Sequence, residues 1–281
     1  MDITLADERA FNVMPQFTFE VARDRLEQKK TSLVTSGLGA VFSRPKPEEI
    51  QFVSVESRVE SFWLVTVLVH TAYDRNCSYT IPLSGSEIKQ VTILGQDFTT
   101  TANPKGGANF SLNGVEHCVE DHRSSFTFDG ISGVKGDFSK YLSFAKSEID
   151  DLEHFAPPGV LVVPPQARAS AVVRPVLAEV IKPIQAQVIH EERVDLEAIE
   201  LNFRPVYALE YDWTSKGKHV ILEFDALTGE MRSGGKKFSD QFKGIITRDL
   251  VFDITADAVG LFVPGGSIAV KLVKAVVDQK K

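Results

Sequence analysis

Apolar and polar positions along this chain follow a pattern that predicts strands over most of its length. Between residues 50 and 94, short runs rich in Val, Ile, Thr, Phe and Tyr are separated by polar turns. Nearly every position in 62–70 is apolar, which is typical of a central strand covered on both faces. The predicted strands are 50–59, 61–72, 77–83, 88–94, 188–201, 206–213 and 219–224.

Helical spacing is confined to three segments. Apolar residues recur at helical intervals within 18–30, and 169–181 has a helical composition. The strongly apolar segment 254–277 is interrupted by Pro264-Gly265-Gly266, which indicates two short helices. The expected fold class is α+β: an antiparallel β-rich core from two related strand-turn-strand units, with an N-terminal helical arm and a C-terminal helical hairpin.

Proline-rich stretches at 44–49 and 155–165 mark boundaries, because proline lacks a backbone donor and restricts the residue before it. We therefore divide the chain into five segments. They are an N-terminal helical arm (1–49), a first β unit (50–154), a proline-rich connector and helix (155–187), a second β unit (188–240) and a C-terminal helical segment (241–281).

An internal repeat is the most specific feature of the sequence. Residues 126–133 (FTFDGISG) match 222–229 (LEFDALTG) at identical offsets. The shared pattern is apolar-x-Phe-Asp-small-apolar-hydroxyl-Gly, which is typical of a strand ending in a turn. Its Asp and hydroxyl side chains accept backbone hydrogen bonds, and its Gly takes a positive φ. The repeat predicts a duplicated β module.

The stretch from Arg204 to Tyr211, continued through Phe224 to Glu230, resembles a strand-turn-strand unit of uncharacterised bacterial proteins. Its end is similar to the hairpin of PepSY-type domains. The resemblance covers residues 204–230 and implies a binding or regulatory role. It carries over no catalytic residue.

Composition restricts the classes of function. A net charge of −7 and a pI near 5.5 argue against a general nucleic-acid binder, so no nucleic-acid partner is expected. Only two cysteines occur, and residues 1–8 contain acids where a signal peptide has a basic head. We therefore expect a cytoplasmic protein without a disulfide framework.

Chemically reactive residues are densest in Glu116-His117-Cys118-Val119-Glu120-Asp121-His122, to which Cys77 and His70 can be added. Thiolate, imidazole and carboxylate groups bind zinc, so Cys118, His122, His117 and Cys77 are candidate metal ligands. On an extended strand, however, Cys118 and His122 stand about 13 Å apart and His117 points to the opposite face. No cofactor is therefore expected, with zinc as the alternative.

A non-enzymatic protein-binding or scaffold protein, self-association included, is the leading hypothesis. The C-terminal segment supplies candidate partner-binding residues, namely Leu261, Phe262, Ile268 and Leu272. One alternative is a metal-dependent or cysteine-based hydrolase centred on His117, Cys118 and His122. Another is a peripheral membrane protein that uses residues 254–277, since the proline-glycine break and two lysines prevent that segment from spanning a bilayer.

Overall fold

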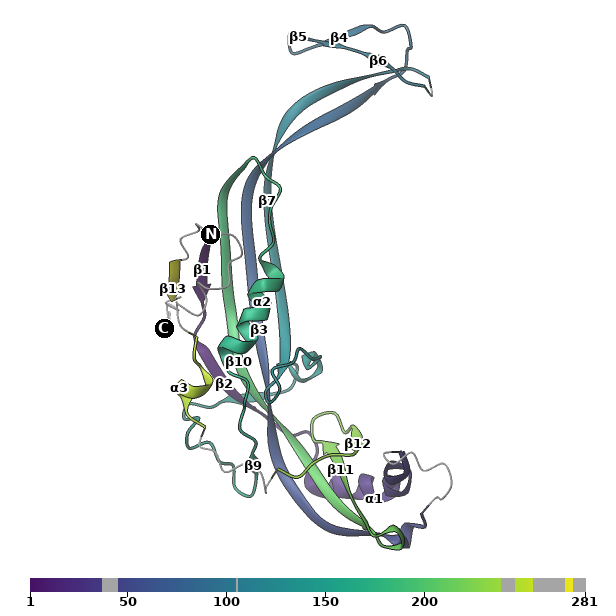
Figure 1. Cartoon of the computed structure of the whole chain (residues 1–281), viewed down its shortest axis with the longest axis vertical. Coiled ribbons are helices and arrows are strands. Elements are labelled where there is room, and N and C mark those ends of the chain that lie inside the picture. The colour runs from purple at the N-terminus through teal and green to yellow at the C-terminus, as the bar shows by residue number, and fades with distance from the viewer. Residues whose placement is uncertain (37–44, 105, 239–245, 255–270, 275–281) are drawn as a thin grey trace.

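The computed structural model describes residues 1–36, 45–104, 106–238 and 246–254, together with the backbone of 271–274. The molecule is elongated, and three long antiparallel strands run along it (Figure 1). The strands are β1 (Asp2–Leu5), β2 (Glu8–Val13), β3 (Ile50–Leu83), β4 (Gln90–Ile93), β5 (Gln96–Thr99), β6 (Thr101–Ala102), β7 (Ala108–Asp129), β8 (Lys146–Glu148), β9 (Leu161–Val162), β10 (Val188–Trp213), β11 (Lys218–Asp225), β12 (Met231–Ser233) and β13 (Lys271–Lys274). The helices are α1 (Phe19–Ser36), α2 (Ala169–Val180) and α3 (Arg248–Val251), with 3₁₀ turns at Pro47–Glu49, Ser139–Tyr141 and Thr214–Lys216.

The main sheet is mixed and contains eleven of the described strands, of which the central ones follow the order β12-β11-β10-β3-β7-β6. The short strands β1 and β2 pair parallel to β10, and β9 pairs parallel to β3. The strand β13 extends the sheet beside β1, and β8 extends it beside β2. A separate two-stranded hairpin, β4–β5, lies at the far end of the molecule (Figure 1).

The α+β prediction is wrong, because 50% of the described residues lie in strands and only 18% in helices. The N-terminal segment contributes β1 and β2 to the sheet as well as α1, so it is not a helical arm. At the C-terminus, residues 271–274 form β13 instead of a helix, because their backbone pairs with β1, Leu272 opposite Ile3. The core is also not purely antiparallel, since β1, β2 and β9 run parallel to their neighbours.

Two of the strands are far longer than the predicted runs. The predicted strands at 50–59, 61–72 and 77–83 join into β3, and those at 188–201 and 206–213 join into β10. Pro205 does not interrupt β10, because it lies where the outer neighbour changes from β2, last paired at Phe203, to β11, first paired at Val206. As predicted, residues 62–70 occupy a central position, with β10 on one side and β7 on the other.

Three buried apolar clusters stabilise the main sheet and the helices that pack on it. The largest lies under α2, where Trp63, Val65 and Val67 are fully buried against Val172 and Leu177. Burial of such side chains contributes about 1.5–3 kcal/mol each relative to exposure. A second cluster joins α1 to β10 and β11, and a third contains Phe62, Tyr141 and Leu227.

The two segments of the internal repeat form the same turn. The Asp129 Oδ1 accepts hydrogen bonds from the amides of residues 131 and 132, and the Asp225 Oδ1 accepts from those of residues 227 and 228. In each turn the glycine four residues after the Asp, Gly133 or Gly229, has a positive φ and donates its N–H to the Asp carbonyl. The chain then returns to pair with the Phe before the Asp, at Lys135 and at Met231.

The two repeats also match in the segments that precede the helices. The first half of the chain contains β2, α1 and the β3–β7 hairpin, and the second half contains β9, α2 and the β10–β11 hairpin. Each of these segments packs on the hairpin of the other half. Gln16 and Phe17 donate their amides to the carbonyl of Ala226, while Gln166 and Ala167 donate theirs to Gly130. The strands that precede these segments pair in equivalent registers: β2 runs parallel to β10, and β9 runs parallel to β3. Thus β2 and α1, from the first half, pack on the β10–β11 hairpin, whereas β9 and α2, from the second half, pack on the β3–β7 hairpin.

The two hairpins are related by an approximate two-fold axis between Glu60 and Arg204, which face each other across β3 and β10. They differ in their turns. The β10–β11 hairpin closes after the Trp213–Lys218 pair with a four-residue turn. At the equivalent Val69–His122 pair, β3 and β7 instead continue away from the body (Figure 1). We call residues 75–116 the projecting hairpin, and residues 84–107 its tip.

Candidate functional site

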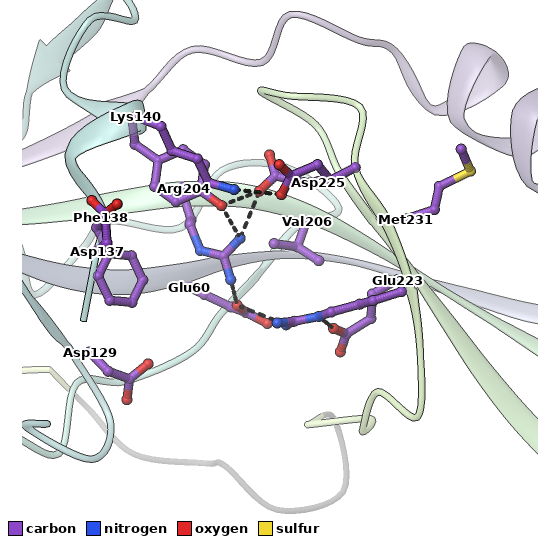
Figure 2. A pocket seen from close by; sticks show the side chains of 13 residues that line it. Glu60, Asp129, Asp137, Phe138, Lys140, Arg204, Val206, Glu223, Asp225 and Met231 are labelled. Carbon is purple, nitrogen blue, oxygen red and sulfur yellow. Dashed lines mark hydrogen bonds and ion pairs between the residues drawn. The ribbon is translucent and has the colours of Figure 1, made fainter. Parts of the chain in front are cut away.

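A group of polar and charged side chains, most of them buried, lies at the approximate two-fold axis, beside a cavity of about 460 Å³ (Figure 2). Its members come from the middle of β3 and β10, from β11 and β12, and from the 3₁₀ turn at Ser139–Tyr141. We call it the charge cluster. It comprises Glu56, Arg58, Glu60, Tyr141, Arg204, Glu223, Asp225 and Arg232.

Arg58 is the centre of the charge cluster, and its side chain is 0% exposed. Its Nε and Nη2 donate to Glu60 Oε1 at 2.8 and 2.6 Å, and Nη2 also donates to Glu223 Oε1 at 2.5 Å. Its Nη1 donates to Glu56 and to the carbonyl of Lys236. Every nitrogen of this buried guanidinium therefore has an acceptor, as the burial of a charge requires.

Glu60 connects Arg58 to the second half of the molecule. Its other oxygen accepts from Arg204 Nη2, and Arg204 Nη1 donates to Asp225 Oδ2 at 3.0 Å. The Tyr141 hydroxyl donates to the same Asp225 oxygen. Positive and negative groups thus alternate from β3 to β11, so the charge cluster joins the two hairpins.

The charges of the cluster support one another. Burial alone raises the pKa of Glu223, but the neighbouring Arg58 and Arg232 outweigh burial and hold that pKa below its usual range. Burial raises the pKa of the Tyr141 phenol, and its hydrogen bond to Asp225 adds to the rise although Arg204 opposes it. At neutral pH Glu223 is therefore charged and the Tyr141 phenol keeps its proton, so neither group is an activated nucleophile.

The projecting hairpin is the second candidate site, and its two faces differ. On one face, which we call the apolar face, the paired rows are Arg75–Glu116, Cys77–Gly114, Tyr79–Leu112, Ile81–Phe110 and Leu83–Ala108. The other face carries Asn76, Ser78, Thr80, Ser111 and Asn113, with Val115 and Pro82 as its apolar residues. On the apolar face Ala108 and Phe110 are buried, Arg75 and Tyr79 are exposed, and the other paired residues are half-buried, so the face is partly open.

The edges of the projecting hairpin are also open. Among the described strands, β3 has no neighbour beyond Asp74 on the side where β10 lies, and β7 has only the two-residue β6 on its outer side. Exposed large hydrophobic side chains gather on this hairpin and at its root: Tyr79, Leu94, Val115, Val119, Val188 and Ile189. These are features of an interaction surface.

Asp74 lies at the root of the projecting hairpin, where three strands become two. Its carboxylate oxygens lie 2.6 Å from His117 Nδ1 on β7 and 2.9 Å from His190 Nε2 on β10. Hydrogen bonds with His190 and His117 hold the pKa of Asp74 below its usual range. The residue therefore ties the three strands together at the point where the hairpin leaves the body.

The sequence-predicted metal ligands do not converge. Cys118 lies on the apolar face opposite Tyr73, whereas His117 lies on the other face beside Asp74. Cys77 shares the face of Cys118 but pairs with Gly114 farther along the ribbon, and His122 pairs with Val69 nearer the body. Within the described ranges, no group of three or more His, Cys, Asp or Glu side chains could hold a metal ion.

Of the predicted partner-binding residues, Leu261, Phe262 and Ile268 lie outside the described residues. Leu272 is in β13, of which only the backbone is described. In the part of the chain that the structure describes, no helix combines the length and the apolar character needed to cross a membrane.

Sequence reasoning missed both candidate sites and the exchange of segments, although the charge cluster and the exchange each left a signal. Glu56, Arg58 and Glu60 alternate with other residues in a strand, which places all three charges on one face. The exchange of segments is marked by Val13-Met14-Pro15-Gln16 and Val163-Pro164-Pro165-Gln166, each three residues before a helix begins.

No protein-family model, curated protein or solved structure matched this chain.

Proposed function

We propose that this is a non-enzymatic protein-binding or scaffold protein, and that its projecting hairpin is the binding element. The observation that carries the proposal is a two-stranded ribbon with a partly open apolar face and open edges, held away from the body by a long strand (Figure 1). The resemblance of residues 204–230 to a binding or regulatory unit is consistent with it, and remains a prediction.

The stability of the ribbon supports the proposal. A two-stranded hairpin with little buried surface is marginally stable in water, because few apolar contacts offset the entropy of ordering the chain. Open strand edges also present unpaired N–H and C=O groups to any partner. A second protein that covers the apolar face would supply the missing burial, so binding and ordering of the ribbon are coupled.

The hydrolase hypothesis has less support. The acids of the charge cluster are paired with arginines, and Cys118 lies on the face opposite His117. We also propose a cytoplasmic location. Cys77 and Cys118 are free thiols on the proposed binding face, and a reducing compartment keeps such thiols from forming disulfides.

Site-specific photocrosslinking tests the proposal. A photoreactive benzoylphenylalanine at Tyr79 samples the apolar face, and the same residue at Ser78 samples the other face of the same strand. Both positions are exposed, so they are matched in access. After irradiation in an extract of the source cells, we expect the Tyr79 variant to crosslink to a protein chain, its own included, and the Ser78 variant to crosslink far less.

Equal crosslinking from Tyr79 and Ser78, or none from either, would contradict the proposal. Far-ultraviolet circular dichroism of both variants, with spectra like the parent's, shows that the ribbon is intact. The comparison then reports on the face and not on folding.

A further inference from the structure

We infer that the projecting hairpin binds its partner by strand addition: an extended segment of another protein pairs with the outer edge of β7 at residues 110–115. This inference rests on the proposed function, because it states how the same hairpin holds its partner and which kind of segment it takes. Three observations carry it: the direction of the backbone groups of β7, the distribution of charge along that strand, and the pairing of β6 on the same edge.

The outer side of β7 presents the backbone groups that a new strand needs. Near the end of β7, the carbonyl of Thr127 and the amide of Asp129 point outward, because they bond with the returning segment 134–136. Backbone groups alternate between the two sides of a strand, and the pairing of β7 with β3 has one unbroken register from residue 129 to residue 108. The outward direction therefore recurs at Ser111, Asn113 and Val115. Among the described strands, none pairs with these three residues.

The distribution of charge along β7 singles out the same segment. Residues 116–123 (EHCVEDHR) contain six acidic or basic side chains, whereas residues 110–115 (FSLNGV) contain none. Charged side chains on an exposed edge hinder the approach of another strand, which is one way that sheets avoid edge-to-edge association. The edge is therefore protected at 116–123 and unprotected at 110–115.

The chain itself shows that this edge accepts a strand. The two residues of β6 pair antiparallel with Asn109 and Ala108, on the outer side of β7. The residue before β6, Thr100, turns away from the edge, and its amide donates to the carbonyl of Lys89. A partner strand that begins at Phe110 therefore continues a pairing that β6 starts.

The opposite edge of the ribbon, formed by β3, is less suited to a new strand. The carbonyl of Asp74 faces that side and accepts from the amide of Gln187 at 2.7 Å, so the segment that leads into β10 occupies the start of the edge. Pro82 lies an even number of residues farther along, so its nitrogen faces the same side, and proline has no hydrogen to donate. Strand addition is therefore favoured on the β7 edge.

The neighbours of the β7 edge define the side chains of the partner segment. Phe110 and Leu112 lie on the apolar face, and Ser111 and Asn113 lie on the other face. Because cross-strand neighbours on one face pack together, the partner's residues alternate between apolar and uncharged polar types. The net charge of −7 disfavours an acidic segment. The occupant is thus an extended, non-acidic segment with this alternation, long enough to match residues 110–115.

Matched proline variants of the full chain test the inference. Ser78 and Asn113 are paired across the ribbon, both are exposed, and their amides point outward to opposite edges. Asn113→Pro removes a donor from the β7 edge, and Ser78→Pro removes one from the β3 edge. Both keep the inward hydrogen bonds between β3 and β7, because proline is tolerated where its nitrogen faces away from the paired strand. Circular dichroism of both variants checks that the fold is kept.

The probe is a phage-displayed library of random twelve-residue peptides, selected on the parent chain. We expect the selected sequences to alternate between apolar and uncharged polar residues. As synthetic peptides, their Kd should rise about tenfold or more with Asn113→Pro, because the peptide loses a backbone donor and meets the proline ring. With Ser78→Pro the Kd should change less than about twofold, since the β7 edge is intact.

Hydrogen exchange of single amides, resolved by nuclear magnetic resonance, gives a second readout. In the free chain the amides of residues 112 and 114 bond to β3, whereas those of residues 111, 113 and 115 face outward. A bound strand should slow exchange at 111, 113 and 115 about tenfold or more and leave 112 and 114 little changed. A ligand that covers only a face of the ribbon gives no such alternation.

Equal effects of the two proline variants, a larger effect of Ser78→Pro, or exchange that slows without alternation would overturn the inference. Failure to select any peptide would also overturn it. The Tyr79 photocrosslink tests the proposed function separately. If it captured a partner while these tests failed, the hairpin would bind through its apolar face and strand addition alone would be wrong. If it captured none, both would fail.

Discussion

Arg58 illustrates how a charge is accommodated inside this sheet. A guanidinium without exposure is costly to desolvate, and Arg58 is stabilised only because Glu60, Glu223, Glu56 and a backbone carbonyl surround it. Removal of the arginine leaves buried carboxylates without their cation. Arg58 is therefore required for the stability of the junction between the two hairpins.

Arg58→Ala should lower the free energy of unfolding by about 3–5 kcal/mol, the usual cost of breaking a buried ion pair. Arg75→Ala is the matched control, because Arg75 pairs with Glu116 on the same strand but at an exposed position. It should change stability little, since water already solvates both partners. Urea denaturation followed by circular dichroism measures both, and equal losses would show that burial of the charge cluster is unimportant.

The depressed pKa of Glu223 predicts a dependence of stability on pH. A carboxyl whose pKa is lower in the folded state stabilises the fold above its unfolded value, here 4.5, and loses that contribution as the pH falls through the folded value. Glu223→Gln should therefore be less stable than the parent at neutral pH. The difference should shrink progressively below about pH 4.5.

Unfolding free energies of the two chains at several pH values measure this dependence. Glu179→Gln, which alters an exposed ion pair with Lys135, is the control and should show a far smaller difference at neutral pH. A Glu223→Gln difference that stays constant, or grows, toward acid would contradict the assigned role of Glu223.

Charges such as Arg58 and Glu223 could not be assigned to the interior from sequence, because charged residues are almost never fully buried unless paired. Arg58 and Glu223 pair with each other across 165 residues of the chain, a contact that no local pattern specifies. The features that the sequence predicted correctly are local. The turns that begin at Asp129 and Asp225 depend only on residues within four positions, and both form as predicted.

At the level of elements, the two repeated turns offer a matched pair of variants. Asp129→Asn keeps the Oδ1 acceptor of its turn and should change the free energy of unfolding by less than about 0.5 kcal/mol. Asp225→Asn keeps the same turn but removes the charge that faces Arg204, so it should cost about 1.5–3 kcal/mol. Thermal or urea unfolding compares them, and equal effects would contradict a special role for the second turn.

The sequence predicted which regions form strands, but it did not predict the lengths of the strands or their partners. Polar turns such as the one at 73–76 suggested breaks in β3, yet pairing with β7 continues across them. The segments that carry α1 and α2 pack on the hairpin of the other half, and the Val-x-Pro-Gln match before each helix does not specify which hairpin that segment joins. Tertiary pairing determined the elements at these places.

At the scale of the whole molecule, the body consists of two equivalent hairpins, each completed by a segment of the other half. The projecting hairpin has no counterpart in the second half, where Thr214–Gly217 closes the ribbon. It is therefore an addition to one of two related units. An element that the body does not need for its own core is suited to contact another chain, and this is the basis of the proposed function.

The most direct test of this account exchanges the projecting hairpin for the turn of the other half. Residues 76–115 are replaced by Thr-Ser-Lys-Gly, which retains the Arg75–Glu116 row and the Asp74 contacts at the root. Both chains are then tagged and compared for the proteins that they capture from an extract of the source cells, with urea unfolding as the check on the body. We predict that the shortened chain unfolds cooperatively and captures no specific protein, whereas the parent captures one. A shortened chain that captures the same protein, or a parent that captures none, would contradict the account.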